Sequence, residues 1–247
     1  MKQFIISRWQ VPYLFVWQVI AIFLLASWFI EPTRTFWLEC DDFIFRYFNN
    51  SLRYGSDSWR MLWAVMNHRA FDAVSAGLLT LVFIESAWRN GRATWAWHAA
   101  VVSVTVIAVL IGTRIGHMIP VERPSATMLN QDTFRLNHWA SGFETKDISY
   151  STFPGDHGMV ALIGFGYAFH YLGSWQALAA FGAGLVILMP RLVSGAHWLS
   201  DELVGAGFVG ILVLSWSFYT PAADHLVGRL ERYWRKVWPV EPVVPHA

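Results

Sequence analysis

The chain has 247 residues, of which 55% are hydrophobic and only 14% are charged, and its mean hydropathy is +0.37. Ordinary soluble domains carry about 25% charged residues, so this composition excludes a soluble enzyme and indicates an integral membrane protein. The net charge of +1 leaves no basic excess for a nucleic-acid partner, and the single cysteine, Cys40, excludes an intrachain disulfide.

Six apolar segments are long enough, alone or with their flanks, to cross a bilayer as helices. The first follows a basic start, but it is too long for the core of a signal peptide and lacks a small-residue cleavage site, so we interpret it as a retained anchor. The uncharged run from Gly158 to Pro190 exceeds one crossing and is broken at Gly173 and Ser174, which predicts two helices joined by a tight turn. The expected spans are residues 11–30, 71–88, 93–117, 158–172, 175–190 and 202–220. We therefore expect residues 1–247 to form one all-α membrane domain with six transmembrane helices.

The basic residues between these spans predict the orientation of the chain. They form three groups on one side: Lys2 and Arg8, then Arg89 and Arg92, then Arg229, Arg232, Arg235 and Lys236. Lys and Arg in short loops favour the cytoplasm, so both termini are expected to be cytoplasmic. The opposite side then holds residues 31–70, 118–156 and 191–201.

Two regions outside the spans have amphipathic or aromatic patterns. The first external segment contains two short aromatic stretches, residues 42–50 and 58–67, which are expected to lie flat in the membrane interface. After the last span, Leu226, Leu230 and Trp234 repeat at helical spacing opposite the arginines, which predicts an interfacial helix on the cytoplasmic face.

The ionisable residues that point to chemistry lie on the external side. His197 and Asp201 are four residues apart, a spacing that puts both on one helical face, where the carboxylate accepts a hydrogen bond from one ring nitrogen and leaves the other as a nucleophile. His157 opens the fourth span, and Arg123 and Arg191 supply planar guanidinium groups that match phosphate oxygens. This set predicts phosphoryl transfer through a covalent phosphohistidine, without a metal or another cofactor.

Three alternatives remain open for these residues. A zinc site built from His157, His197 and Asp201 is disfavoured, because the nearby arginines oppose a dication. The residues could also be paired polar groups at helix ends, although ionisable residues at membrane depth are usually functional. A non-catalytic scaffold or transporter is the third alternative, and the clustering of four ionisable motif residues on one side argues against it.

The motifs resemble those of the membrane type 2 phosphatidic acid phosphatases. The resemblance rests on Arg-Pro at 123–124, on Pro-Gly-Asp-His at 154–157, and on the arginine, histidine and aspartate at 191, 197 and 201. It implies that His197 is the nucleophile, that Asp201 orients it, that His157 protonates the leaving group, and that Arg123 and Arg191 hold the phosphate. It also implies a metal-independent reaction and six helices.

A narrower resemblance is to the lipid A 1-diphosphate synthases, also called lipid A phosphotransferases. It rests on scattered segments: FW at 36–37, IFRYFN from 44, NHRAFD from 67, TKD from 145, FPGDHGM from 153 and PRLVSGAHW from 190. It implies a bacterial inner-membrane enzyme whose site faces the periplasm and which moves a phosphate from undecaprenyl diphosphate to the 1-phosphate of lipid A. The implied partners are these two lipids, with no protein partner assigned. If water accepts the phosphoryl group instead, the enzyme is an undecaprenyl diphosphate phosphatase or a lipid A phosphatase, and both acceptors remain open.

The chain departs from the superfamily pattern at three positions. Gly116 stands in place of a lysine, Gly155-Asp156 in place of Ser-Gly, and Pro190 in place of a serine. We therefore expect the phosphate pocket to be rebuilt.

Other residues on the external side are expected to complete this pocket. Further cations there are Arg69, Arg114 and Lys146; we expect Lys146 or Arg114 to replace the missing lysine, and we favour Lys146 because it lies in a matching segment. Asp156 is expected either to raise the pKa of the adjacent His157 or to bind Lys146.

Overall fold

A computed structural model describes residues 6–239, and among these residues it is helical with no β-strand. Lys2, which contributed to the predicted orientation, lies outside the described residues. The elements in chain order are α1 (Val11–Ala26), α2 (Thr33–Tyr54), α3 (Asp57–Met66), α4 (Arg69–Asn90), η1 (Arg92–Thr94), α5 (Trp95–Gly116), α6 (Ala126–Leu129), α7 (Leu136–Trp139), α8 (Asp156–Tyr171), α9 (Ser174–Val193), η2 (Asp201–Ala206), α10 (Gly207–Phe218) and α11 (Ala222–Val237).

The predicted spans agree with the positions of the helices. Each expected span coincides with a helix, and the break predicted at Gly173 and Ser174 falls between α8 and α9. Four helical segments are long and apolar enough to cross a membrane: Arg69–Asn90, Arg92–Gly116, Ser174–Val193 and Asp201–Phe218. Helices α1 and α8 have 16 residues each, fewer than a full crossing normally uses. The chain is therefore an all-helical protein with several membrane-spanning helices.

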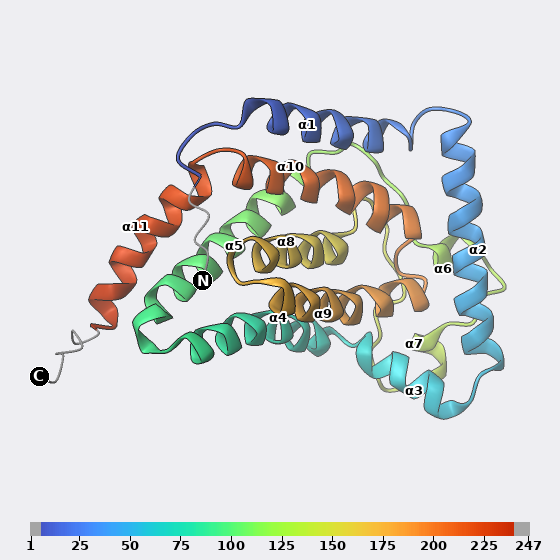
Figure 1. The fold of residues 1–247 in the computed structure, drawn as a ribbon. Helices are drawn as coiled ribbons and strands as arrows, with labels where there is room; N and C mark the ends of the chain where they lie inside the picture. Colours follow the sequence, from blue (N-terminus) through green and yellow to red (C-terminus); the bar gives the residue numbers. More distant parts are fainter. Residues whose placement is uncertain (1–5, 240–247) are drawn as a thin grey trace, which may run out of the picture.

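The central helices pack around one apolar core. In Figure 1, α8 and α9 lie between α10 on one side and α4 on the other, while α5 runs diagonally beside α8. The buried core residues come from six helices: Leu79 and Phe83 of α4, Val101 and Val104 of α5, Met159, Ile163 and Tyr167 of α8, Ile187 of α9, Val209 and Val213 of α10, and Val227 of α11. The helices that carry the residues described below are therefore packed closely against one another.

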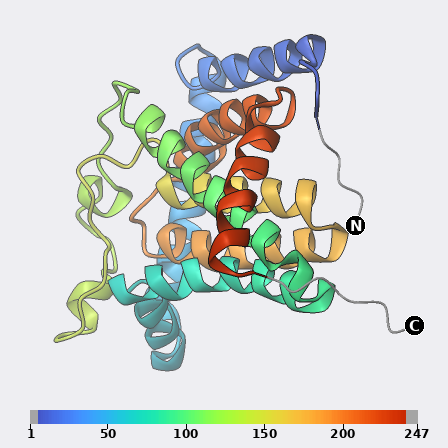
Figure 2. The same cartoon turned by 90° about the vertical axis from the view of Figure 1, so that its left-hand side faces the viewer.

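The two ends of this bundle carry different elements. Helices α2, α3, α6 and α7 lie at one end, and α11 lies at the other (Figure 1); in Figure 2, which views the molecule from the α11 side, α11 is in front. The backbone amide of Ile6 donates to Asp224 of α11, so the described start of the chain lies at the α11 end. Leu226, Leu230 and Trp234 of α11 pack against the core, and the described parts of both termini therefore share one end of the bundle.

Helix α2 differs from its predicted form. We expected a short aromatic stretch at residues 42–50, but α2 is a continuous helix of 22 residues that runs across the bundle end. Its buried residues are Asp41, Phe45, Asn49 and Leu52, which recur every three or four positions and face the bundle. The helix is longer than the aromatic stretch indicated because its buried face is partly polar, so hydropathy alone does not reveal it. The second stretch, residues 58–67, agrees closely with α3.

Candidate active site

The two histidines predicted to carry the chemistry meet at the end of the bundle where α2 lies. His157 is in the first turn of α8, and His197 lies in the turn that follows α9. Their ring centroids are 5.9 Å apart. Arg191, in the last turn of α9, places its Nε 3.1 Å from Nε2 of His157. The structure thus brings together three of the predicted site residues from two helices and a turn.

The turn after α9 fixes the orientation of the His197 ring. Gly195 has φ +73°, and a Cβ there would lie 2.7 Å from the Phe45 ring, so this position requires glycine. Nδ1 of His197 lies 3.0 Å from the carbonyl oxygen of Thr152 and donates to it, which leaves Nε2 as the unprotonated nitrogen. Burial lowers the pKa of His197 to about 4, so its imidazole is neutral at neutral pH. A neutral, buried imidazole with a free Nε2 has the properties of a nucleophile.

The expected hydrogen bond between His197 and Asp201 is absent. The shortest distance between Nδ1 of His197 and the Asp201 carboxylate is 3.8 Å, which is too long for a hydrogen bond. Oδ2 of Asp201 instead accepts from the backbone N–H of Trp198 at 2.7 Å. The prediction was wrong because residues 194–198 form a turn, so positions 197 and 201 do not share a helical face. Asp201 therefore holds the loop that carries His197, and the Thr152 carbonyl holds the ring.

Sequence reasoning missed a second carboxylate near His197. Oε1 of Glu202 lies 3.7 Å from Nδ1 of His197, while Oε2 accepts from the backbone N–H of Gly158 at 2.8 Å. A Cβ at Gly155 or Gly158 would lie within 2.3 Å of Oε2, so both glycines make room for this side chain. Glu202 belongs to η2, a π-helical turn, and such turns are rare and often found at functional sites. An acidic pair at the start of an apolar span was the signal for it.

Arg123 forms what we call the Arg123 cluster, with Asp41, Ser200 and Asp201. Its Nη2 donates to Asp41 at 2.6 Å, and its Nη1 donates to Asp201 and to Ser200 at 2.8 Å each. The guanidinium also lies over the rings of Trp28 and Trp198, at 5.3 and 4.7 Å from their centroids. Arg123 therefore links α2 to the start of η2, and its predicted contact with phosphate stays a prediction.

Arg191 forms the Arg191 cluster, with Asn67, Asp72 and His157. Its Nη1 donates to Oδ1 of Asn67 and its Nη2 donates to Oδ1 of Asp72, both at 2.6 Å. Arg191 is only 1% exposed, whereas half of the Asp72 side chain is exposed. Asn67 and Asp72 were not predicted as site residues, although both lie in the NHRAFD segment that carries the narrower resemblance.

His157 lies between two carboxylates. Its Nδ1 is 2.5 Å from Oδ1 of Asp156, and its Nε2 is 3.3 Å from Oδ1 of Asp72. His157 lies just before the expected span 158–172. Burial opposes its positive charge, but the hydrogen bonds to Asp156 and Asp72 outweigh burial and raise the pKa of His157 to about 9. The expected effect of Asp156 on His157 is in agreement with this direction. A protonated His157 at neutral pH is suited to act as a general acid.

A pocket of about 300 Å³ adjoins His197, and both Gly116 and Lys146 line it together with Asp156. Lys146, in the loop between α7 and α8, thus lines the same pocket as Gly116, and its role as a replacement for the missing lysine stays a prediction. The backbone of Lys146 is fixed by Asn67, whose side-chain amide donates to the Lys146 carbonyl at 2.8 Å. Arg69 and Arg114 are exposed and do not line this pocket.

The residues that could hold a metal ion differ from those expected from the sequence. Asp156, His157 and His197 offer ligand atoms within 4.8 Å of one another, whereas the zinc alternative had included Asp201 in place of Asp156. Arg191 contacts His157, and Lys146 lines the same pocket as His197 and Asp156, so their positive charges oppose a dication here. The arrangement fits an anionic ligand better than a metal ion.

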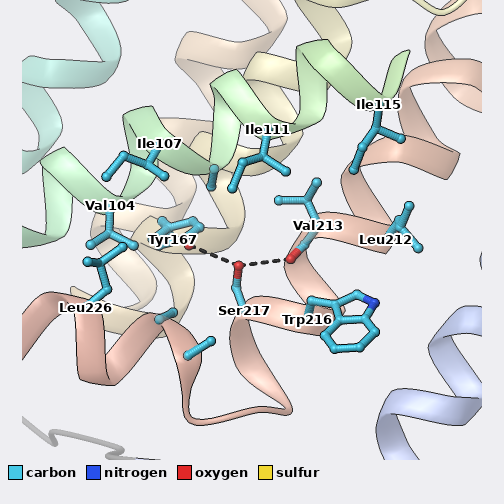
Figure 3. Close-up of a pocket in the computed structure, with 13 residues that line it drawn as sticks. Val104, Ile107, Ile111, Ile115, Tyr167, Leu212, Val213, Trp216, Ser217 and Leu226 are labelled. Carbon is cyan, nitrogen blue, oxygen red and sulfur yellow. Dashed lines mark hydrogen bonds between the residues drawn. The ribbon is translucent and has the colours of Figure 1, made fainter. Parts of the chain in front are cut away.

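A second cavity lies away from the histidines, between α5, α10 and α11. It measures about 280 Å³ and is lined mainly by apolar side chains such as Ile107, Ile111 and Trp216 (Figure 3). Its polar groups are paired, because the Tyr167 hydroxyl donates to Ser217, which donates to the carbonyl of Val213. None of the predicted site residues lines this cavity, so it is separate from the candidate active site.

Comparison with known proteins places the chain in a family. Residues 97–225 match the model of the PAP2 superfamily. The chain is 34% identical over 225 residues to the lipid A 1-diphosphate synthase of Escherichia coli (strain K12), which covers 88% of this chain and 92% of the relative. No solved structure matches significantly. These matches confirm the resemblance stated above: the chain belongs to the PAP2 superfamily of phosphatases and phosphotransferases, and it is a membrane enzyme.

Proposed function

We propose that this enzyme transfers a phosphoryl group from undecaprenyl diphosphate to the 1-phosphate of lipid A, through a phosphohistidine on His197. The observation that carries the proposal is the orientation of His197, whose Nδ1 is bound to Thr152 while the ring lines the pocket that contains Lys146. The name of the Escherichia coli relative supports lipid A 1-diphosphate as the product.

In the proposed first step, Nε2 of His197 attacks the terminal phosphorus of the donor. The N–P bond forms as the P–O bond to undecaprenyl phosphate breaks, and Nε2–H of His157 gives its proton to the leaving oxygen. Arg191 and Lys146 offset the negative charge of the transferring group, which is the dominant requirement in phosphoryl transfer. Asp201 holds the loop of His197 through the Trp198 amide.

In the second step, an oxygen of the lipid A 1-phosphate attacks the phosphorus, and the N–P bond breaks to return a neutral His197. A phosphate monoester has a second pKa of about 6, so it is mostly a dianion at neutral pH. This acceptor therefore needs no general base. Water does need one, and this difference bears on which acceptor the enzyme uses.

We also propose six transmembrane helices, cytoplasmic termini and a site that faces the periplasm of the bacterial inner membrane. Arg92 in η1 and the basic helix α11 support this orientation, because they lie at the end of the bundle opposite α2, whereas the histidines lie at the α2 end. In a Cys40→Ser background, Tyr150→Cys should react with an impermeant maleimide added to spheroplasts. Tyr233→Cys should react only after lysis; the reverse pattern would contradict the orientation.

The reaction itself is tested with purified enzyme, lipid A and undecaprenyl diphosphate labelled in its terminal phosphate. We expect label on lipid A and an acid-labile, alkali-stable phosphoenzyme, and we expect His197→Gln to abolish both. Label released only as free phosphate would instead establish an undecaprenyl diphosphate phosphatase. Full turnover by His197→Gln would remove the phosphohistidine from the mechanism.

A further inference from the structure

One nitrogen of His157 lies between two groups of opposite hydrogen-bonding character. Nε of Arg191, a donor, is 3.1 Å from Nε2, and Oδ1 of Asp72, an acceptor, is 3.3 Å from the same nitrogen. An imidazole nitrogen carries either a proton or a lone pair, so it can bond to only one of them at a time. The protonation state of His157 therefore selects its partner.

The two states correspond to the two halves of the proposed reaction. Protonated His157 donates from Nε2 to Asp72, and then to the leaving oxygen of the donor. Once that proton has been given away, the Nε2 lone pair faces the Nε–H of Arg191 and accepts it. A lone pair occupied in this way cannot remove a proton from water.

Arg191 is held in place for this contact by the NHRAFD segment. Asn67 is completely buried and accepts from Nη1, while Asp72 accepts from Nη2. These two contacts fix the planar guanidinium, and its orientation leaves Nε directed at His157. The carboxylate of Asp72 supplies the charge-assisted hydrogen bond among them, which is roughly twice as strong as a neutral one.

We propose that Asp72 is a positioning residue that holds Arg191 as a cap on the deprotonated His157, and that this cap protects the phosphohistidine from water. The inference rests on the proposed function and deepens it. A phosphate dianion attacks without a base, whereas water requires one, so capping His157 slows hydrolysis and leaves transfer unaffected.

The test uses Asp72→Asn, which keeps the side chain's size and its carbonyl oxygen but removes the charge that fixes Arg191. With labelled donor and lipid A, we expect the ratio of label on lipid A to free phosphate to fall about tenfold, because general-base help to water becomes available. The matched control is Asp42→Asn, which removes the carboxylate of an exposed pair with Arg46 on α2. Its ratio should equal that of the wild type.

A second measurement separates positioning from mere structural support. The phosphoenzyme is formed, donor and acceptor are removed, and its decay in water is followed. Asp72→Asn should decay about tenfold faster than the wild type, whereas a general loosening would also slow phosphoenzyme formation. Equal decay rates, or a loss of formation and transfer in the same proportion, would overturn the inference. If the wild type forms a phosphoenzyme but never labels lipid A, the proposed acceptor fails, while the decay comparison still tests the cap.

Discussion

The Arg123 and Arg191 clusters contain the same kind of buried cation in two different settings. Both arginines are less than 10% exposed, and the family resemblance assigns both to phosphate. Arg123 is bonded to two carboxylates, Asp41 and Asp201, that are themselves fully buried. Arg191 is bonded to one half-exposed carboxylate and to a histidine. Arg191 therefore has a carboxylate partner that reaches the surface, whereas the two carboxylates of Arg123 cannot move without opening the fold. Residue type and burial alone therefore do not define the role of an arginine; the surroundings of its partners also matter.

The largest expected effect is a loss of folding stability when the Arg123 cluster is broken. Arg123→Gln leaves the buried carboxylates of Asp41 and Asp201 without their cation, and breaking a buried ion pair in this way costs about 3–5 kcal/mol. We expect a loss of this size in the free energy of unfolding, measured by denaturation in detergent. A variant that stays as stable as the wild type but loses turnover would place Arg123 in the substrate site instead.

The next effect falls on chemistry and not on the fold. Arg191→Gln removes the cation beside His157 but leaves Asp72 half-exposed to solvent, so it should unfold less readily than Arg123→Gln. Its turnover should fall by roughly 10²–10³, the usual effect of removing one group that stabilises transition-state charge. Steady-state rates on labelled donor, compared with the unfolding data, provide the measurement. A loss of turnover smaller than tenfold would show that Arg191, like Arg123, does not stabilise charge in the transition state, and the proposed difference between the two clusters would be wrong.

A smaller effect is expected from the cation in the pocket. Lys146→Ala should weaken donor binding about tenfold, as expected for one phosphate contact worth about 1.4 kcal/mol, with little change in stability. Arg114→Ala and Arg69→Ala should have smaller effects, because both side chains are exposed and neither lines the pocket. Measured KM values test this order. If Arg114→Ala proved more harmful than Lys146→Ala, the replacement for the missing lysine would be Arg114.

The smallest effect concerns pH. Phosphoenzyme formation needs neutral His197, present above its pKa of about 4, and protonated His157, present below its pKa of about 9. The rate should therefore be level between these values and fall on either side. Asp156→Asn removes an anion from Nδ1 of His157, so the alkaline limb should move down by about one pH unit while the rate at pH 7 changes little. Single-turnover rates across pH provide the test, and an unmoved alkaline limb would show that Asp156 does not tune His157.

Local sequence patterns predicted most helices and the two histidines of the site, but not the hydrogen-bond partners of these histidines. Each of the six apolar segments found by hydropathy coincides with a helix, since the apolar content of a segment is a property of neighbouring residues, whereas the partly polar α2 was not recognised at its full length. The motifs correctly predicted that His157 and His197 lie close together, and Lys146 lines the same pocket as Gly116. The bond expected between positions 197 and 201 failed because helical spacing was assumed for a turn.

The partners of Arg191 could not be predicted from spacing. Asp72 and Asn67 precede it by 119 and 124 residues, and no periodicity links positions so far apart. A matching segment marked their region, but only the packing of α4 against α9 shows what they contact. Long-range hydrogen bonds of this kind are properties of the assembled fold.

The wide turn of η2 has a consequence for how such a site can vary. An α-helix advances about 100° per residue, so deleting one residue from positions 203–206 would rewind the turn and rotate everything before it by about that angle relative to α10. The histidine loop, Asp201 and Glu202 would rotate together, so Asp201 would lose its contact with Arg123 and Glu202 its contact with the Gly158 amide, while α10 kept its packing against α8. The π-helical turn thus sets the orientation of Asp201 and Glu202 separately from that of α10. A one-residue insertion or deletion in this turn would change the first without changing the second.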